Sequence, residues 1–143
     1  MSRVFVVVHM AWATRARSPV LDPQKDAVVK AVLNEAARRE HSTLLAVGIA
    51  WDHVHVIAQQ SPRTSTSALA QRLKGFSAHE LNARLIFPRG VWWQVGYFAQ
   101  SISEVDVASA VAYVRNQRVH HDASHPMEHW LIESPTKSDF TEG

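Results

Sequence analysis

Two strand-like segments separated by only three residues constrain the possible folds more than any other feature of this chain. Residues 42–49 and 53–59 are rich in β-branched and apolar side chains, and the Ala50-Trp51-Asp52 segment between them is short enough for a hairpin turn. Because strands joined by a short turn pair antiparallel, we expect a mostly antiparallel sheet.

Helical and strand-like segments lie on both sides of this hairpin. Asp22 followed by Pro23 is typical of a helix start, and Ser103 with Asp106 three residues later forms a capping box. The predicted elements are, in chain order, a strand over 4–13, a helix over 22–40, the two hairpin strands, a helix beginning at Ser65 or Ser67, a strand over 91–101 and a helix over 103–118. This β-α-β-β-α-β-α order predicts an α+β, ferredoxin-like fold, in which an antiparallel sheet carries helices on one face.

Length and composition narrow the class of protein. The 143 residues, 46% of them hydrophobic, predict a single domain over 1–143. The absence of cysteine excludes disulfides, thiolate zinc sites and cysteine nucleophiles, and it fits a cytoplasmic location. No apolar stretch reaches the roughly 20 residues that span a bilayer, so no membrane partner is expected. The five glycines form no phosphate-binding loop, so no nucleotide cofactor is expected either.

Nine histidines are an unusual number, and two of them form the first candidate for chemistry. His53 and His55 are two residues apart in a predicted strand, so both imidazoles project from the same face. Two neutral imidazoles on one face can chelate a divalent cation. The pattern by itself also fits two surface histidines that alternate with core valines. His9, which alternates with valines in the first strand, is interpreted as a core histidine.

Tyr113 and Gln117 form a second candidate in the last predicted helix. Residues four apart lie one above the other on a helix, and this pair is about a quarter-turn away from the inward stripe of Val107, Val111 and Val114. A tyrosine hydroxyl can act as a covalent nucleophile, and a glutamine supplies an oxygen ligand. From the residues alone, Tyr113 is either such a nucleophile or a side chain that covers the edge of the core.

Basic and aromatic side chains form a third feature. Fifteen basic against 13 acidic side chains give a net charge of +2, which permits a nucleic-acid partner without requiring one. Cations interleaved with aromatic rings suit single-stranded nucleic acid, which offers phosphates and unstacked bases together. The same residues also fit a solvated face beside an ordinary aromatic core. The candidate DNA-binding residues are Arg15, Arg17, Arg72, Lys74, Ser77 and Arg115, near the aromatic residues Trp92, Trp93, Tyr97 and Phe98.

Taken together, these segments resemble the small single-tyrosine HUH transposases, which move insertion sequences of the two-hundred type as single-stranded DNA. The resemblance covers roughly residues 3–121, which leaves a catalytic core over that range and a C-terminal tail over 122–143. One departure is Trp51, where relatives often carry proline. The motifs that carry the resemblance are HMAWATRARSPVL, WDHVHVIAQ, SALAQRLKGFSAHEL, VWWQVGYFAQSIS and AVAYVRNQRVHH.

The resemblance implies a role for each matched residue. His53 and His55 correspond to the HUH pair and Gln117 to the third ligand of a Mg²⁺ or Mn²⁺ ion. Tyr113 corresponds to the nucleophile that forms a 5′-phosphotyrosine, and Lys74 to a lysine near the DNA. The expected substrate is single-stranded DNA with hairpins at the ends of the mobile element, and the expected assembly is a homodimer.

Three other functions compete with this interpretation. A histidine-triad nucleotide hydrolase also uses alternating histidines, but it needs a third histidine where this chain has Ile57. A domesticated, REP-associated tyrosine transposase that acts on palindromic repeats would share the same chemistry. A non-catalytic module that binds single-stranded nucleic acid would need neither Tyr113 nor a divalent metal ion.

Overall fold

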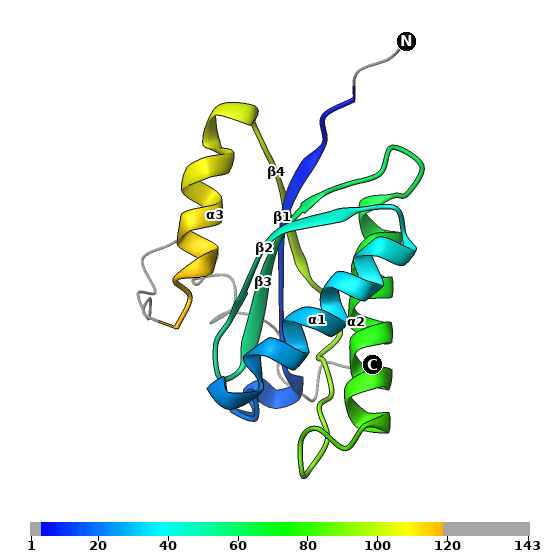
Figure 1. Cartoon of the computed structure of the whole chain (residues 1–143), viewed down its shortest axis with the longest axis vertical. Coiled ribbons are helices and arrows are strands. Elements are labelled where there is room, and N and C mark those ends of the chain that lie inside the picture. The colour runs from blue at the N-terminus through cyan, green and yellow to red at the C-terminus, as the bar shows by residue number, and fades with distance from the viewer. Residues whose placement is uncertain (1–3, 119–143) are drawn as a thin grey trace.

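The computed structural model describes residues 4–118 as one antiparallel sheet with helices on both sides (Figure 1). The strand order is β2-β3-β1-β4, which confirms the predicted α+β, ferredoxin-like architecture. The strands are β1 (Val7–Ala13), β2 (Thr43–Ile49), β3 (His53–Gln59) and β4 (Phe98–Ile102), and the α-helices are α1 (Asp26–Arg39), α2 (Thr66–Ala83) and α3 (Val107–Arg115). The predicted tail over 122–143 lies outside the described residues.

The predicted hairpin is confirmed, and it brings β3 into the middle of the sheet. Strand β3 pairs with β2 on one side and with β1 on the other, both antiparallel. In this register His55 lies opposite Gly48 of β2 and Ala11 of β1. Because side chains alternate along a strand, the odd-numbered residues of β1 and β3 point to one face and the even-numbered residues to the other.

Helices α1 and α2 cover the even-numbered face. Their apolar side chains pack against the sheet to form the main hydrophobic core, which includes Met10, Trp12, Val54 and Leu33. Helix α2 begins where the sequence predicts, with the Ser65 hydroxyl accepting a hydrogen bond from the backbone N–H of Ala68. Asp22 accepts one from the backbone N–H of Gln24, but it caps a short 3-10 turn over Pro23–Lys25, and α1 itself begins only at Asp26. Most of the buried apolar side chains among the described residues belong to this layer.

Helix α3 lies across the odd-numbered face, which differs from the expected placement of all helices on one face (Figure 1). Val114 is fully buried in a second, smaller cluster with Val7 and Ile57. The sequence predicts the inward stripe of valines on this helix, but helical spacing does not determine which face of the sheet the stripe packs against. The odd-numbered face therefore has a thin apolar cover at one end and polar side chains at the other.

The last strand is shorter than predicted. Residues 91–101 were expected to be extended throughout, but β4 spans only Phe98–Ile102, and Trp93 forms an isolated bridge to Thr14. The intervening chain leaves the ladder at Gly96, whose φ of +94° suits glycine. The Lys74 ammonium donates to the carbonyl oxygens of Gln94 and Gly96, both at 2.8 Å, and so holds this excursion in place.

Helix α3 also ends at Arg115, rather than near Arg118 as the sequence predicts. Within residues 4–118, none of the helices combines the length and the apolar character needed to cross a membrane.

Candidate active site

Strand β3 presents two buried imidazoles to α3. His53 and His55 are 6% and 0% exposed, and their ring centroids lie 5.0 Å apart at an interplanar angle of 76°. Two neighbouring odd-numbered positions place both rings on the face opposite the main core, as the alternation predicts. The interpretation as two surface histidines is therefore wrong.

Helix α3 and the turn after it bring Tyr113 and Gln117 to these rings. The Tyr113 ring meets the His55 ring edge-on, with centroids 6.0 Å apart and an interplanar angle of 88°. Gln117 is buried, and its Nε2 lies 3.1 Å from Nε2 of His53. The four residues singled out by the sequence thus meet in one place within one chain, although they come from segments more than fifty residues apart.

Gly48 makes this meeting possible. A Cβ atom at this position would lie 2.0 Å from the carbonyl oxygen of Val114 and 2.9 Å from Cβ of Gln117. These distances leave no room for any other residue, because the nearer atom belongs to the backbone of α3. Only a glycine here lets the end of α3 sit directly on β2, beside the His55 position.

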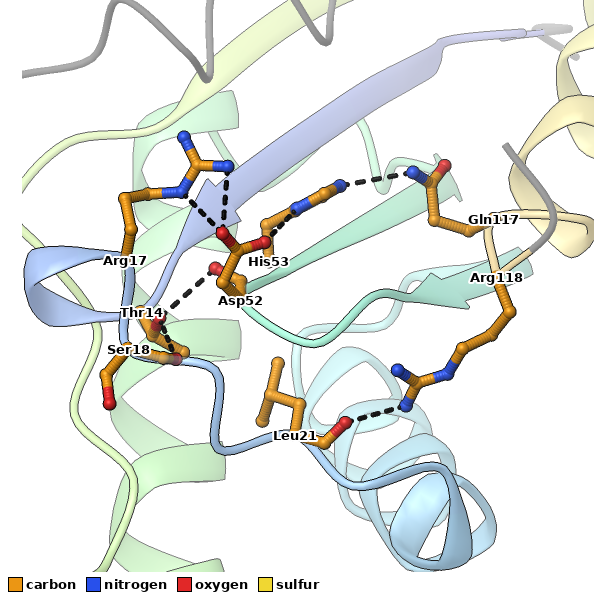
Figure 2. A network of polar contacts seen from close by, with 8 residues as sticks. All are labelled: Thr14, Arg17, Ser18, Leu21, Asp52, His53, Gln117 and Arg118. Carbon is orange, nitrogen blue, oxygen red and sulfur yellow. Dashed lines mark hydrogen bonds and ion pairs between the residues drawn. The ribbon is translucent and has the colours of Figure 1, made fainter. Parts of the chain in front are cut away.

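Asp52 and Arg17 support His53 from behind (Figure 2). The Asp52 carboxylate lies 2.8 Å from Nδ1 of His53, and Arg17 donates to the same carboxylate through Nε and Nη2, both at 3.1 Å. Burial alone would raise the pKa of Asp52, but the hydrogen bond from His53 and the charge of Arg17 outweigh it, so that the pKa lies below its ordinary value. The charged Asp52 carboxylate accepts a hydrogen bond from Nδ1–H of His53, so that the lone pair on Nε2 of His53 faces Gln117.

Arg118 fixes the turn that carries Gln117. Its guanidinium donates to the backbone carbonyl of Leu21 at 2.8 Å (Figure 2). It also donates to the Asp26 carboxylate at 2.7 Å and lies over the Trp51 ring at 5.7 Å. These contacts tie the end of α3 to the start of α1. The sequence gives no indication of this anchoring position, because Asp26 and Leu21 are more than ninety residues away from Arg118.

His9 is a further member of this cluster, although the sequence indicates only a core histidine at this position. His9 is buried, as a core histidine should be, but its Nε2 lies 3.0 Å from Nδ1 of His55. The signal that could have found it is its odd-numbered position on the strand that pairs with β3. His9 also lines a cavity of about 410 Å³ together with Tyr113, Gln100 and Ser103.

The candidate DNA-binding residues do not form one patch. Lys74 and Arg15 line a groove of about 580 Å³ beside the half-exposed Trp92, with the Arg15 guanidinium 5.9 Å from the Trp92 ring. Burial lowers the pKa of Lys74 to about 8. Arg72 is exposed on another part of α2, within 3.8 Å of Glu40.

The burial of Ser77 contradicts its predicted role as a DNA-binding residue. The side chain is fully buried: its hydroxyl accepts from the Trp93 indole N–H at 3.0 Å and donates to the Lys74 carbonyl at 3.1 Å. A side chain enclosed in this way cannot contact DNA.

Two further DNA-binding candidates lie elsewhere. Arg17 binds the Asp52 carboxylate behind His53, and the exposed Arg115 donates to the Leu45 carbonyl at 3.4 Å.

The donor set fits a divalent cation. Among residues 4–118, no group of three or more His, Cys, Asp or Glu side chains is arranged to hold a metal ion, so a site here needs the Gln117 amide as its third ligand. The 3.1 Å between the Gln117 amide and Nε2 of His53 matches the separation of about 3 Å between adjacent ligands of an ion with bonds near 2.1 Å. Rotating the amide by half a turn would present its oxygen in place of its nitrogen.

Comparisons with known proteins agree with one another. A family model described as "Transposase IS200 like" matches residues 4–117. A candidate transposase from Deinococcus radiodurans R1 is 27% identical with a TM-score of 0.64, over 82% of this chain and 94% of that chain. A REP-associated tyrosine transposase solved with a REP hairpin shares the fold, with 15% identity and a TM-score of 0.63, over 100% of this chain and 95% of that chain. A search among curated proteins finds no match.

Proposed function

This chain belongs to the IS200-like transposase family, and we propose that it cleaves and rejoins single-stranded DNA through a covalent bond to Tyr113. The observation that carries the proposal is the meeting of His55 and Tyr113, 6.0 Å apart between ring centroids, with Gln117 beside His53. Tyr113 lies outside the main core and packs against the edge of the smaller apolar cluster, with its ring beside the buried imidazole of His55. It is well placed to meet a phosphate held by the imidazole pair.

The reaction exchanges one phosphodiester for another. The Tyr113 oxygen bonds to phosphorus, the bond from phosphorus to the 3′ oxygen breaks, and the proton lost by the phenol is balanced by the one that the 3′-hydroxyl gains. The 5′-phosphotyrosine keeps the energy of the original bond, so a 3′-hydroxyl of another strand end can reverse the step without a nucleotide cofactor. A free tyrosine has a pKa of about 10, so the site must favour loss of the phenol proton.

His53, His55 and Gln117 would hold the metal ion, with Mg²⁺ or Mn²⁺ as the candidates. Mixed nitrogen and oxygen ligands suit Mn²⁺ at least as well as Mg²⁺, which prefers oxygen. When bound, such an ion polarises the scissile phosphate and orients it for in-line attack. The contribution of the chain itself is the rigid placement of the ligands, through Asp52 behind His53 and Gly48 beneath Gln117.

The proposed substrate is single-stranded DNA that carries hairpins. The REP-associated relative was solved with a REP hairpin, which favours a hairpin here too. In this chain the groove of Arg15, Lys74 and Trp92 offers positive charge beside an exposed aromatic ring, a combination that binds unpaired nucleotides. Arg72 and Arg115 would add to binding through the phosphates, so affinity should fall with salt.

We also propose a homodimer, which size-exclusion chromatography with light scattering would test. Tyr113 faces His55 of its own chain in this structure, so each protomer of such a dimer has the parts of a complete site.

The fold shared with the REP-associated enzyme favours one second candidate function, action on palindromic repeats. Oligonucleotides from scattered palindromes and from the flanks of the gene would separate the two.

The decisive experiment replaces each of the two tyrosines with phenylalanine. Wild-type protein incubated with single-stranded oligonucleotides from its gene flanks and Mn²⁺ should give a covalent adduct on a denaturing gel. Tyr113→Phe should abolish the adduct and leave hairpin binding intact, because only the attacking oxygen is lost. The matched control, Tyr97→Phe, should retain it. An adduct that persists in Tyr113→Phe would reassign the nucleophile.

A second variant addresses the imidazole pair. His55→Ala should lose metal-dependent cleavage, since one ligand of the proposed ion is gone. Cleavage at the wild-type rate in this variant would remove His55 from the metal site, and adduct formation without any divalent ion would remove the metal from the mechanism.

A further inference from the structure

His9 and His55 make a buried contact between two imidazoles. His9 is 6% exposed on β1, and its Nε2 lies 3.0 Å from Nδ1 of His55. The rings are 5.2 Å apart between centroids and inclined at 48°. In the register of the sheet, His9 is opposite Ile57 and so is one step diagonally removed from His55 on the same face. This placement is set by the backbone pairing of β1 with β3 and leaves the two rings little freedom.

The chemistry of this contact has two alternatives. A neutral imidazole carries one N–H donor and one acceptor nitrogen, so either His9 donates to His55 or His55 donates to His9. If His9 donated, Nδ1 of His55 would be the acceptor and its proton would sit on Nε2, which could then not bind a cation. If His55 donates from Nδ1, its Nε2 carries the lone pair that a cation needs.

We propose that His9 is a positioning residue, which accepts a hydrogen bond from Nδ1–H of His55 and thereby fixes His55 as a metal ligand through Nε2. This inference rests on the proposed function, since it concerns the same site. It goes further by assigning a residue that lies outside the HUH pair, the tyrosine and the glutamine. His9 then carries its own proton on Nδ1 and acts only through His55.

The neighbouring histidine supports this assignment. Nδ1 of His53 lies 2.8 Å from the Asp52 carboxylate, so both members of the pair have Nδ1 engaged by a buried or half-buried partner. Metal-binding histidines in general have their second nitrogen held in this way, and removal of the partner typically weakens metal binding 10- to 100-fold. The two partners differ in one respect: a carboxylate can only accept, whereas His9 can accept or donate. The proposal therefore predicts that His9 accepts the hydrogen bond from His55 and does not donate it.

The first test measures the tautomer directly and needs no metal. In metal-free, full-length protein, nitrogen-15 NMR of the histidine rings should find the His55 proton on Nδ1. In His9→Leu, which removes the acceptor, the His55 signal should move toward a mixture of the two tautomers. A wild-type signal with the proton on Nε2 would overturn the proposal, whatever the metal requirement of the enzyme proves to be.

The second test uses Mn²⁺ binding followed by electron paramagnetic resonance. His9→Leu should weaken Mn²⁺ binding about 10- to 100-fold, as loss of such a partner does elsewhere. His9→Gln keeps an acceptor oxygen and should bind Mn²⁺ more tightly than His9→Leu. Equal Mn²⁺ affinity of wild type and a folded His9→Leu would contradict the proposal. If the wild type itself bound no Mn²⁺, the metal in the proposed function would fail, and the tautomer measurement would still decide the role of His9.

Discussion

The two faces of the same sheet differ in what they bury. The face under α1 and α2 buries apolar side chains such as Met10 and Trp12, whereas the face under α3 buries His9 and His55 next to a small apolar cluster. Both sets come from the same strands, separated only by the alternation of side chains. The fold thus places the main apolar core on one face and the candidate active site on the other.

This difference leads to opposite expectations for substitutions. Truncation of an apolar core side chain under α1 and α2 should lower the free energy of unfolding and leave the activity of the folded fraction unchanged. A change on the α3 face should act on metal binding and adduct formation more than on stability.

Gly48→Ala should reduce adduct formation to background. Its new methyl group would lie 2.0 Å from the backbone oxygen of Val114, so the end of α3 must leave β2 and take Gln117 and Tyr113 away from the histidines. A gel assay with Mn²⁺ measures the adduct. The matched control is Gly75→Ala in α2, where the new methyl meets nothing within 4 Å and should leave adduct formation unchanged. Full activity of Gly48→Ala would show that docking of α3 on β2 is not required.

Leu33→Ala should show the opposite pattern. This side chain is fully buried in the main core, and truncation of such a leucine costs about 2–5 kcal/mol of unfolding free energy. Denaturant titration monitored by circular dichroism measures the loss. Adduct formation per folded molecule should stay at the wild-type level. A folded Leu33→Ala that loses the adduct would refute the separation of the two faces.

The same separation explains how much of the site could be predicted. Local alternation along a strand is enough to predict that His53 and His55 share a face. Helical spacing is enough to predict that Tyr113 and Gln117 are near one another. Their meeting across more than fifty residues could not be derived from spacing, because it depends on which face α3 crosses. The resemblance to a family supplied the association, and the close approach at Gly48 supplies its physical reason.

Two errors of sequence interpretation have a common origin. Residues 91–97 carry β-forming aromatic side chains, which favour a strand. In the structure, hydrogen bonds from Lys74 to the carbonyls of Gln94 and Gly96 hold this segment away from the strand pairing. Ser77 is polar and was placed on a DNA-binding surface, but its partner is the indole of Trp93. In both cases the deciding contact joins α2 to a distant loop, and local propensity carries no information about it.

Asp52→Asn should have an intermediate effect on the chemistry of the α3 face. An amide can donate to Nδ1 as well as accept from it, so it no longer fixes the His53 tautomer, and Mn²⁺ affinity should fall about 10- to 100-fold. Titration of Mn²⁺ by electron paramagnetic resonance measures the affinity. Unchanged affinity would show that His53 needs no acceptor behind it.

The pKa of Asp52 adds a stability test with a definite sign. Because the folded protein lowers this pKa below its ordinary value of 3.8, the charged carboxylate stabilises the fold above that pH. The contribution disappears as the pH falls through the lower, folded value. Acidification below about pH 4 should therefore destabilise wild type more than Asp52→Asn. An identical acid dependence of the two proteins would mean that the carboxylate contributes nothing to folding.

Lys74 gives the smallest expected effect and the sharpest contrast, because one proton should act in opposite directions on stability and on DNA binding. Burial lowers its folded pKa to about 8 from 10.5, so the unfolded chain binds more protons between these values, and the free energy of unfolding should gain a contribution as the pH rises through them. Over the same range the groove loses a positive charge, and affinity for single-stranded DNA should fall a few-fold. Lys74→Gln has no charge to lose, so subtracting its pH profiles isolates both contributions. Parallel profiles of wild type and Lys74→Gln in both assays would show that the charge of Lys74 contributes neither to the free energy of unfolding nor to DNA binding.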